Sequence, residues 1–300
     1  MAKSLPDLAE LLPSWQLAMR AERKSDRTIK SYTEGVQVFV RWCESTGTAP
    51  ELTMSTVQAY IADVLDRGAE AATALARQKA VRRYAVWLVD EGELDTNPLL
   101  GLKAPKQDRK VPEPLTDDEL RRLVKACKGT TLRDRRDEAI VRLMAETGLR
   151  AGEVIGLRLG DVDLGRGLAT VRRGEGGNGR IVPFSPQTAA ALDRYIRSRR
   201  THPLSDTVAL WIGTRARTAL TYFGLDKTLR ERARAAGLQR FHLHLMRHTA
   251  ATRWLRAGGS EQGLMAVAGL SSRSMLDRYT GASASERAAA EARTLGLGEL

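Results

Sequence analysis

The sequence predicts a mainly α-helical fold, with an N-terminal four-helix bundle followed by a mostly helical domain that contains a small antiparallel β-sheet. Three observations support this fold class. Apolar residues recur at helical spacing through most of the 300 residues. Residues 101–114 interrupt this pattern with three prolines and four cations, which is typical of an extended linker. Two β-type segments flank a glycine-rich turn in the second half of the chain.

Residues 1–100 form the first predicted domain. Asn97-Pro98 ends its last helix, because proline disfavours helical geometry in the residue before it. The connections between the helices are short, as in a small bundle. Four stretches place apolar residues on one helical face: 8–19, 28–43, 57–65 and 75–88.

Residues 115–300 form the second predicted domain. Thr116 and Glu119 have the spacing of a capping box, which marks the start of a helix. Helical patterns resume at Thr221 and continue to a tail helix over residues 285–297. Between these helical parts, strands are expected over residues 168–173 and 180–184.

The net charge predicts a polyanionic partner. The chain has 48 basic and 36 acidic side chains, which give a formal net charge of +12. Residues 111–300 carry nearly all of this excess, with 32 basic and 21 acidic groups. Arginine supplies 38 of the cations, and its planar guanidinium pairs with two phosphate oxygens at once. The alternative is a solvated basic face without a partner.

Basic side chains of the first domain fall into two clusters, one at the junction of the first two helices and one on the fourth helix. Such patches in an otherwise neutral bundle fit a surface that grips a nucleic-acid backbone. The expected contacts are Arg23, Lys24, Arg27, Lys30, Arg77, Lys79, Arg82 and Arg83, together with Arg172, Arg173 and Arg180 beside the glycine-rich turn.

Membrane, secreted and disulfide-rich classes do not fit the sequence. No stretch approaches the roughly 18 apolar residues that a membrane helix requires, and the N-terminus lacks the apolar core of a secretion signal. Cys43 and Cys127 match neither a metal-ligand spacing nor a disulfide framework. We therefore expect an intracellular protein.

Three segments carry the residues that suggest chemistry. In the first, Gly148 ends one helix and the next begins at once, so Arg150 projects from a rigid elbow. In the second, His244 and Arg247 are three residues apart and share a helix face. The third ends at Tyr279. Two arginines, a histidine and a tyrosine suit phosphodiester chemistry without a metal, because the phenol can attack phosphorus while the guanidiniums hold the non-bridging oxygens.

A metal site is the alternative interpretation of two of these regions. His244 and His248 have the i, i+4 spacing of zinc ligands, but Leu245 stands where a metalloprotease helix has its glutamate. Asp161 and Asp163 have the spacing of a nuclease metal pair, but their place before a strand favours a turn. The residues therefore favour a site without a metal.

In this order the three segments resemble the tyrosine recombinase (phage integrase) family. The resemblance covers nearly the whole chain and implies a core-binding domain over 1–100 and a catalytic domain over 115–300, which clamp double-stranded DNA. It corresponds to the short form of the family without an arm-binding domain. Outside the three segments it rests on Ser25, Thr28, Tyr32, Phe39, Trp42, Asn97-Pro98, Pro105-Lys106 and Leu115-Thr116.

The resemblance implies a site-specific recombinase that cuts and rejoins DNA through a 3′-phosphotyrosine, with no metal, ATP or other cofactor. Matched by position, Tyr279 is the nucleophile and His244 handles protons. Arg150 and Arg247 hold the phosphate. Glu153 and His248 then position these groups without contacting the DNA themselves.

Two positions depart from the family pattern. Glu175 stands where the family has a hairpin lysine that protonates the leaving oxygen, and Leu270 stands where it has histidine or tryptophan. Loss of one transition-state donor costs about 10²–10³ in rate. A second hypothesis is therefore a DNA-binding protein on the same fold with weak or lost cleavage. A type IB topoisomerase-like enzyme ranks third.

The resemblance also implies partners and a location. The expected DNA partner is a pair of core recombination sites, which a tetramer of a chain that is monomeric when free would bring together. Residues 285–297 dock onto a neighbouring protomer or pack in cis. The expected location is the cytoplasm of a bacterial or phage-infected cell, at the nucleoid.

Overall fold

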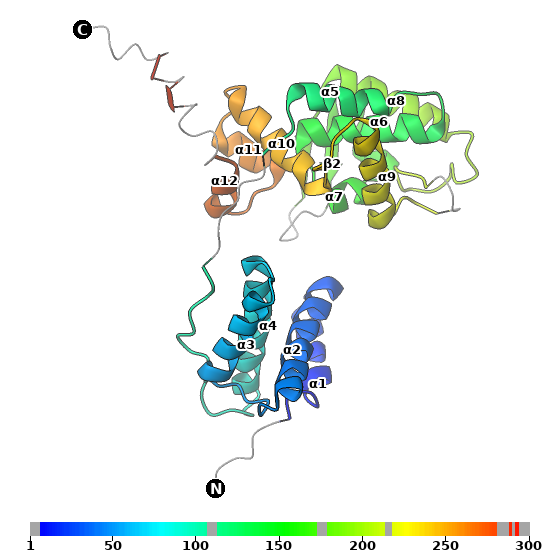
Figure 1. The fold of residues 1–300 in the computed structure, drawn as a ribbon. Helices are drawn as coiled ribbons and strands as arrows, with labels where there is room; N and C mark the ends of the chain where they lie inside the picture. The colour runs from blue at the N-terminus through cyan, green and yellow to red at the C-terminus, as the bar shows by residue number, and fades with distance from the viewer. Residues whose placement is uncertain are drawn as a thin grey trace. The chain divides into compact units, whose positions relative to one another are not determined.

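In the computed structural model the chain divides into two compact units, residues 1–109 and 110–300 (Figure 1). The structure describes residues 7–106, 113–172, 179–213 and 218–280, with short helical pieces at 288–289 and 292–293. Its described elements are helices and a three-stranded antiparallel sheet, so the predicted fold class is confirmed. Among the described residues, the helices are too short or too polar to cross a membrane.

The first unit is a helical bundle. The side-chain oxygens of Ser25 and Thr53 accept hydrogen bonds from backbone amides and cap the second and third helices. Gly47 ends the second helix in the left-handed conformation that glycine adopts without strain. The described helices of this unit are α1 (Leu12–Ala21), α2 (Asp26–Thr46), α3 (Met54–Asp66) and α4 (Ala71–Asp90).

The core of the first unit is rich in aromatic side chains, among them the buried Phe39 and Tyr84. Helices α2 and α4 approach closely at Gly35, where an added Cβ would lie 2.5 Å from the Cβ of Ala80. Leu102 also belongs to this core. The chain therefore remains packed on the bundle beyond residue 101, where the sequence predicts the linker to begin, because Leu102 finds an apolar site there.

The second unit begins with the capping box that the sequence predicts at Thr116 and Glu119. Its elements are α5 (Asp117–Ala126), α6 (Leu132–Thr147), α7 (Ala151–Gly156), the 3₁₀ turn η1 (Leu159–Asp161), β1 (Val162–Asp163), β2 (Leu168–Val171), β3 (Arg180–Pro183), α8 (Pro186–Arg199), α9 (Tyr222–Ala235), α10 (Leu243–Arg256), α11 (Glu261–Ala268) and α12 (Arg273–Thr280).

The sheet has the order β1-β2-β3, with Ala169 of β2 opposite Val162 of β1 and Val182 of β3. Strands β2 and β3 are the two predicted ones, and each ends one or two residues earlier than predicted. Strand β1 was not predicted, because two residues are too few to show alternation. The residues that link β2 to β3 include the glycine-rich turn, of which residues 173–178 lie outside the described part of the chain.

The second unit has a main core and a smaller one beside it. The main core surrounds α6, whose Ile140, Leu143 and Met144 are fully buried. Helix α6 packs against α5, α8 and α10. The smaller core lies among α10, α11 and α12 and includes Leu255, Leu264, Leu270, Leu276 and Tyr279. This smaller core sets the position of α12 relative to α10.

Candidate active site

Arg150 lies at the elbow between α6 and α7 that the glycine spacing predicts. Gly148 ends α6 with a φ of +64°, and the buried Leu149 then anchors the turn. The Arg150 guanidinium donates from both terminal nitrogens to the carbonyl oxygen of Gly269, at 3.2 Å each. Its side chain remains 25% exposed. Arg150 is therefore anchored at one end and accessible to a ligand.

Arg247 of α10 is almost fully buried, with 2% exposed. Its Nη1 donates to the carbonyl oxygens of Gly148 at 2.8 Å and Ala268 at 2.6 Å. These carbonyls lie at the C-terminal ends of α6 and α11, where a helix leaves acceptors unpaired and its dipole attracts a cation. The buried Nη2 has no hydrogen-bond partner within the described residues. An unsatisfied guanidinium N–H is costly to bury, so this atom is a ready donor for an anionic oxygen.

Tyr279 of α12 meets Arg247 directly. Nε of Arg247 donates to the phenol hydroxyl at 3.3 Å, and the tyrosine side chain is 4% exposed. Burial and the nearby charge of Arg150 lower the pKa of Arg247, while Tyr279 and Glu153 act in the opposite direction. The structure therefore brings a phenol and a guanidinium with a free donor into contact.

Two histidines of α10 lie near the phenol, and one of them contacts its ring. The ring of His248 is buried, and its centroid lies 4.7 Å from that of Tyr279. Burial and the neighbouring His244 and His242 lower the pKa of His248 to about 4, so His248 is neutral at pH 7. His244 is exposed at the start of the helix, with its ring centroid 6.3 Å from that of His248. His248 is therefore a neighbour of both His244 and the phenol ring.

Glu153 accepts hydrogen bonds from two arginines. One carboxylate oxygen accepts from the Arg150 backbone at 2.9 Å and from Nη2 of Arg180 at 2.8 Å. The other accepts from Nη1 of Arg150 at 3.3 Å and from Nη1 of Arg180 at 2.8 Å. Burial alone would raise the pKa of Glu153, but these hydrogen bonds and the two positive charges outweigh burial and lower it.

Arg180, which the sequence predicts to contact DNA, binds groups of the protein in this structure. Its guanidinium donates to Glu153 and, through Nε, to the Val267 carbonyl at 2.8 Å. Only 12% of its side chain is exposed. Its partners lie 27 and 87 residues away in the sequence, so no local pattern indicates this pairing.

Comparison with known proteins assigns the chain to a family. Residues 113–286, more than half of the chain, match the phage integrase family, and residues 11–92 match the N-terminal SAM-like domain of phage integrases. The chain belongs to the phage integrase family. The tyrosine recombinase XerC of Xanthomonas campestris pv. campestris (strain B100) is 30% identical to this integrase over 270 residues, which cover 87% of this chain and 81% of XerC.

Solved structures share the fold. The XerH site-specific recombinase bound to a palindromic difH substrate, a post-cleavage complex, gives a TM-score of 0.75 at 19% identity, over 95% of this chain and 84% of XerH. A lambda integrase tetramer bound to a Holliday junction gives 0.69 at 17% identity, over 92% of this chain and 78% of that one. The family match and the XerC relative confirm the expectation of a tyrosine recombinase.

The two departures from the family pattern have different outcomes in the structure of this integrase. Leu270 is 5% exposed and packs in the smaller core with Leu276 and Tyr279, so its apolar side chain helps to hold α12. Glu175 lies outside the described residues, as do Arg173 and most of the predicted tail helix at 285–297.

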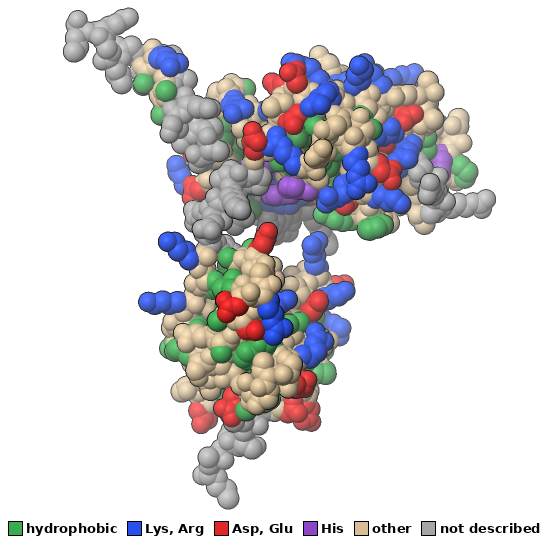
Figure 2. Space-filling model, in the orientation of Figure 1, with side chains coloured by type: hydrophobic (Ala, Val, Ile, Leu, Met, Phe, Trp, Pro, Cys, Tyr) green, Lys and Arg blue, Asp and Glu red, His purple; other side chains and the backbone are tan. Residues whose placement is uncertain are grey.

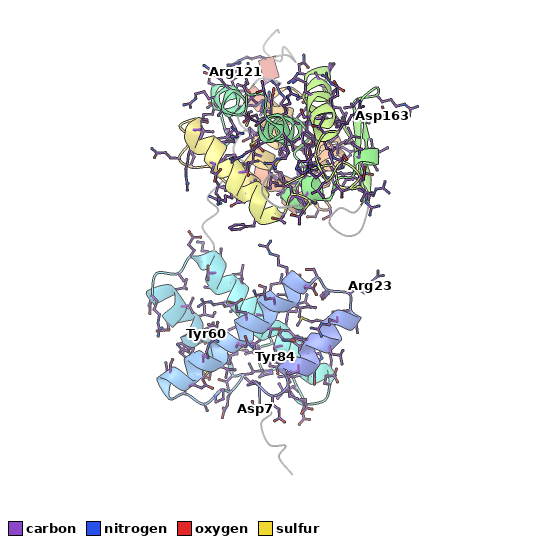
Figure 3. The ribbon with its side chains drawn as sticks, turned by 90° about the vertical axis from the view of Figure 1, so that its right-hand side faces the viewer. Asp7, Arg23, Tyr60, Tyr84, Arg121 and Asp163 are labelled. Atoms are coloured by element: carbon purple, nitrogen blue, oxygen red, sulfur yellow. The ribbon has the colours of Figure 1, made fainter. Side chains whose placement is uncertain are left out.

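The predicted basic clusters of the first unit approach each other at Lys24 and Arg83. Lys24 of the first cluster and Arg83 of the second line one hollow of about 290 Å³. Figure 3 shows Arg23 at the opposite end of the bundle from Asp7. Arg77 is half-buried. The exposed members are Arg23, Lys24, Arg27, Lys30, Lys79, Arg82 and Arg83.

Basic side chains are also scattered over the visible face of the second unit, among acidic ones (Figure 2). Arg172, at the end of β2, pairs with Asp161 at 2.6 Å and keeps 56% of its side chain exposed. Asp161 also accepts from the Arg158 backbone, which supports the interpretation of this segment as a turn. Arg172 therefore remains available for a phosphate.

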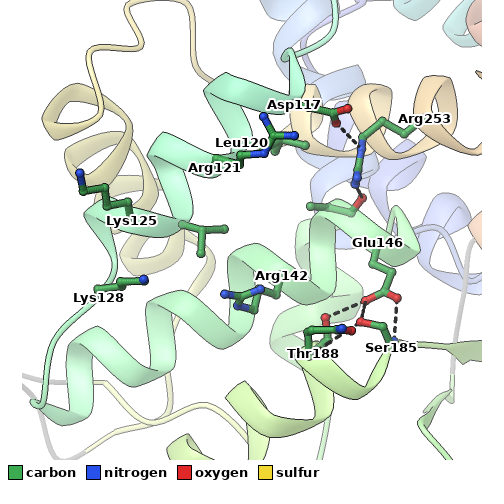
Figure 4. Close-up of a pocket in the computed structure, with 13 residues that line it drawn as sticks. Asp117, Leu120, Arg121, Lys125, Lys128, Arg142, Glu146, Ser185, Thr188 and Arg253 are labelled. Carbon is green, nitrogen blue, oxygen red and sulfur yellow. Dashed lines mark hydrogen bonds and ion pairs between the residues drawn. The ribbon is translucent and has the colours of Figure 1, made fainter.

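A separate hollow of about 630 Å³ lies among α5, α6, α8 and α10 (Figure 4). Two of its charged groups, Arg253 and Asp117, pair with each other, and the Glu146 carboxylate accepts from Ser185 and Thr188. None of the predicted catalytic residues lines it. We assign no chemistry to this hollow.

The sequence did not predict the backbone acceptors of the site. The carbonyls of Gly148, Ala268 and Gly269 hold the two arginines. Gly148 and Gly269 both have positive φ and end helices. The sequence can show that a glycine ends a helix. Which arginine donates to the carbonyls at that helix end is decided by the packing of distant segments.

Proposed function

We propose that this tyrosine recombinase is a site-specific enzyme that cuts and rejoins double-stranded DNA through a covalent 3′-phosphotyrosine on Tyr279. The contact between the Tyr279 hydroxyl and Arg247 carries the proposal. Nη2 of Arg247 has no partner among the residues that the structure describes. A scissile phosphate that supplies an acceptor to this atom brings its phosphorus next to the phenol oxygen. The nucleophilic oxygen and the guanidinium that stabilises negative charge then both act on the same phosphate.

In the proposed reaction the Tyr279 oxygen bonds to phosphorus as the bond from phosphorus to the 5′-oxygen breaks. The phenol proton leaves, and the departing 5′-oxygen gains a proton to become a hydroxyl. His244, exposed at the start of α10, is the group proposed to move protons. Arg150 and Arg247 bind the non-bridging oxygens as negative charge builds. A 5′-hydroxyl from another strand reverses the step and releases Tyr279.

The proposed partners are DNA and further copies of the chain. The exposed cations of the first unit and Arg172 are proposed to contact phosphates, which gives affinity without sequence selection. The structure of lambda integrase as a tetramer on a Holliday junction supports a tetramer at the synapse of this protein. The bacterial origin of the XerC relative supports a place in the bacterial cytoplasm. The proposed DNA partner is the reason to propose the nucleoid as its location there.

A suicide substrate tests this function. Genomic fragments that bind the Tyr279→Phe protein first identify a site, which is then made as a duplex with a nick close to the cleavage point. We expect the unmodified protein to form a covalent protein–DNA adduct and Tyr279→Phe to form none while still binding the duplex. Tyr222→Phe, which changes an exposed tyrosine of α9, is the matched control and should form the adduct. Tight binding without any adduct would instead mean a binding protein without cleavage activity.

A further inference from the structure

We infer that Arg180 is a positioning residue for Arg150. Its positive charge balances the negative charge of Glu153, so that Glu153 can orient Arg150 without cancelling the charge with which Arg150 attracts a phosphate. This inference rests on the proposed role of Arg150 as a phosphate ligand. It assigns to Arg180 a function that neither the family resemblance nor the proposed DNA contacts gave it.

The geometry places Glu153 between the two guanidiniums. Arg180 grips the carboxylate with two hydrogen bonds of 2.8 Å each, one to each oxygen, the bidentate arrangement that is the strongest for this pair. Arg150 approaches the same oxygens with its backbone amide at 2.9 Å and its Nη1 at 3.3 Å. The side chain of Arg180 therefore makes the shorter hydrogen bonds to Glu153, and the side chain of Arg150 makes the longer one.

Charge decides what this arrangement does. The Glu153 side chain is 6% exposed, so its charge is weakly screened by solvent. Arg150 and Glu153 alone would be close to neutral and would attract a phosphate weakly. With Arg180 the three groups carry one net positive charge, and Arg150 is the more exposed of the two cations, at 25% against 12%. The lowered pKa of Glu153 agrees with a carboxylate that stays ionised between them.

Arg180 also joins three segments of the site. It lies at the start of β3, binds α7 through Glu153, and donates to the Val267 carbonyl of α11. Gly269 lies against its guanidinium: an added Cβ there would be 2.7 Å from Cζ of Arg180. The Gly269 carbonyl in turn accepts from Arg150. Arg180 therefore fixes both acceptors of Arg150, the Glu153 carboxylate and the Gly269 carbonyl.

A double-mutant cycle on cleavage of the nicked duplex tests the inference. Arg180→Met removes the neutralising charge and keeps much of the side-chain length. We expect its single-turnover cleavage rate to fall about 10- to 100-fold, the loss typical of a partner that positions a site residue. Adding Glu153→Gln removes the uncompensated carboxylate, so the double variant should cleave at least about 5-fold faster than Arg180→Met alone. The control Arg197→Met removes an exposed ion pair with Asp193 and should cleave like the unmodified protein.

The sign of the coupling separates positioning from a merely structural role. If Arg180 only holds β3 in place, Glu153→Gln removes further contacts, and the double variant is as slow as Arg180→Met or slower. That result would overturn the inference. Should Arg180→Met fail to fold by circular dichroism, Arg180→Lys replaces it in the same cycle. Lysine keeps the charge but loses the bidentate contact with Glu153, so Arg180→Lys should cleave more slowly than the unmodified protein, and adding Glu153→Gln should restore part of that rate.

A second readout does not depend on cleavage. Glu153 faces the charges of Arg150 and Arg180, with Arg247 further away. Titration of its carboxyl carbon by NMR should show a higher pKa in Arg180→Met than in the unmodified protein, because burial is then opposed by fewer positive charges. If no variant forms an adduct, the proposed function fails while this titration still decides the role of Arg180. An unchanged Glu153 titration would overturn the inference.

Discussion

The hydroxyl of Tyr279 lies 3.3 Å from Nε of Arg247, although 32 residues separate them in the chain. The contact depends on the smaller core among α10, α11 and α12, where Leu270 and Leu276 pack beside the tyrosine. The same guanidinium is held by carbonyls at the ends of α6 and α11. A side chain from α12 and the ends of two other helices therefore converge on one arginine of α10.

Arg247→Lys is expected to reduce the single-turnover cleavage rate about 10²–10³-fold, the loss typical of one transition-state donor. Lysine cannot reach Gly148, Ala268 and the Tyr279 hydroxyl at once, because it lacks the planar fork of arginine. Arg253→Lys is the matched control: it makes the same change on the same helix at a residue that is 47% exposed and paired with Asp117. An Arg247→Lys protein that cleaves at the control's rate would contradict this prediction.

His248 is expected to make the stability of the protein depend on pH. Its pKa is about 4 in the folded chain and about 6.5 when unfolded, so the unfolded chain binds this proton first as the pH falls. The contribution of neutral His248 to the free energy of unfolding is complete above about pH 6.5 and is lost as the pH falls toward 4. The total loss is about 3 kcal/mol at most. Urea unfolding between pH 7 and pH 4 measures this loss.

The variant His248→Gln supplies the comparison. Without a titrating group at this position, its free energy of unfolding should fall less over the same pH range than that of the unmodified protein. Parallel pH profiles for the two proteins would show that His248 does not titrate as its burial implies.

Glu175→Lys is expected to speed strand cleavage. The substitution replaces a carboxylate, which repels the phosphate, with an amine that can protonate the leaving 5′-oxygen. A single missing donor accounts for about 10²–10³ in rate, and a gain of at least about 10-fold in single-turnover cleavage is the expected result. An unchanged rate would mean that another group already supplies this proton or that residue 175 does not occupy the family's lysine position.

Gly35→Ala is expected to destabilise the first unit. Alanine normally stabilises a helix relative to glycine by about 1 kcal/mol, but here its Cβ would lie 2.5 Å from the Cβ of Ala80. Overpacking of this kind costs about 1–3 kcal/mol, so the midpoint of urea unfolding should fall. Gly156→Ala is the control, because an added Cβ there meets nothing within 4 Å, and it should leave the midpoint unchanged or raise it.

The sequence predicted the elements of the fold well because their signals are local. The capping box of Thr116 and Glu119 correctly marked the start of α5. Gly148 correctly marked the end of α6, because a left-handed residue without a side chain is the commonest helix stop. The two-residue strand β1 was missed, since so short a segment has no periodicity to read.

By itself the sequence determined which helices form, where Arg150 and Arg247 lie along them and, through the order of the three segments, the family. Only the tertiary structure decided that Arg180 pairs with Glu153 and that Tyr279 rests on Arg247. Hydrophobic periodicity predicts which face of a helix or strand is buried. It does not predict which other element packs against that face. The direction of a buried guanidinium depends on acceptors from several distant segments, which become neighbours only when the cores pack.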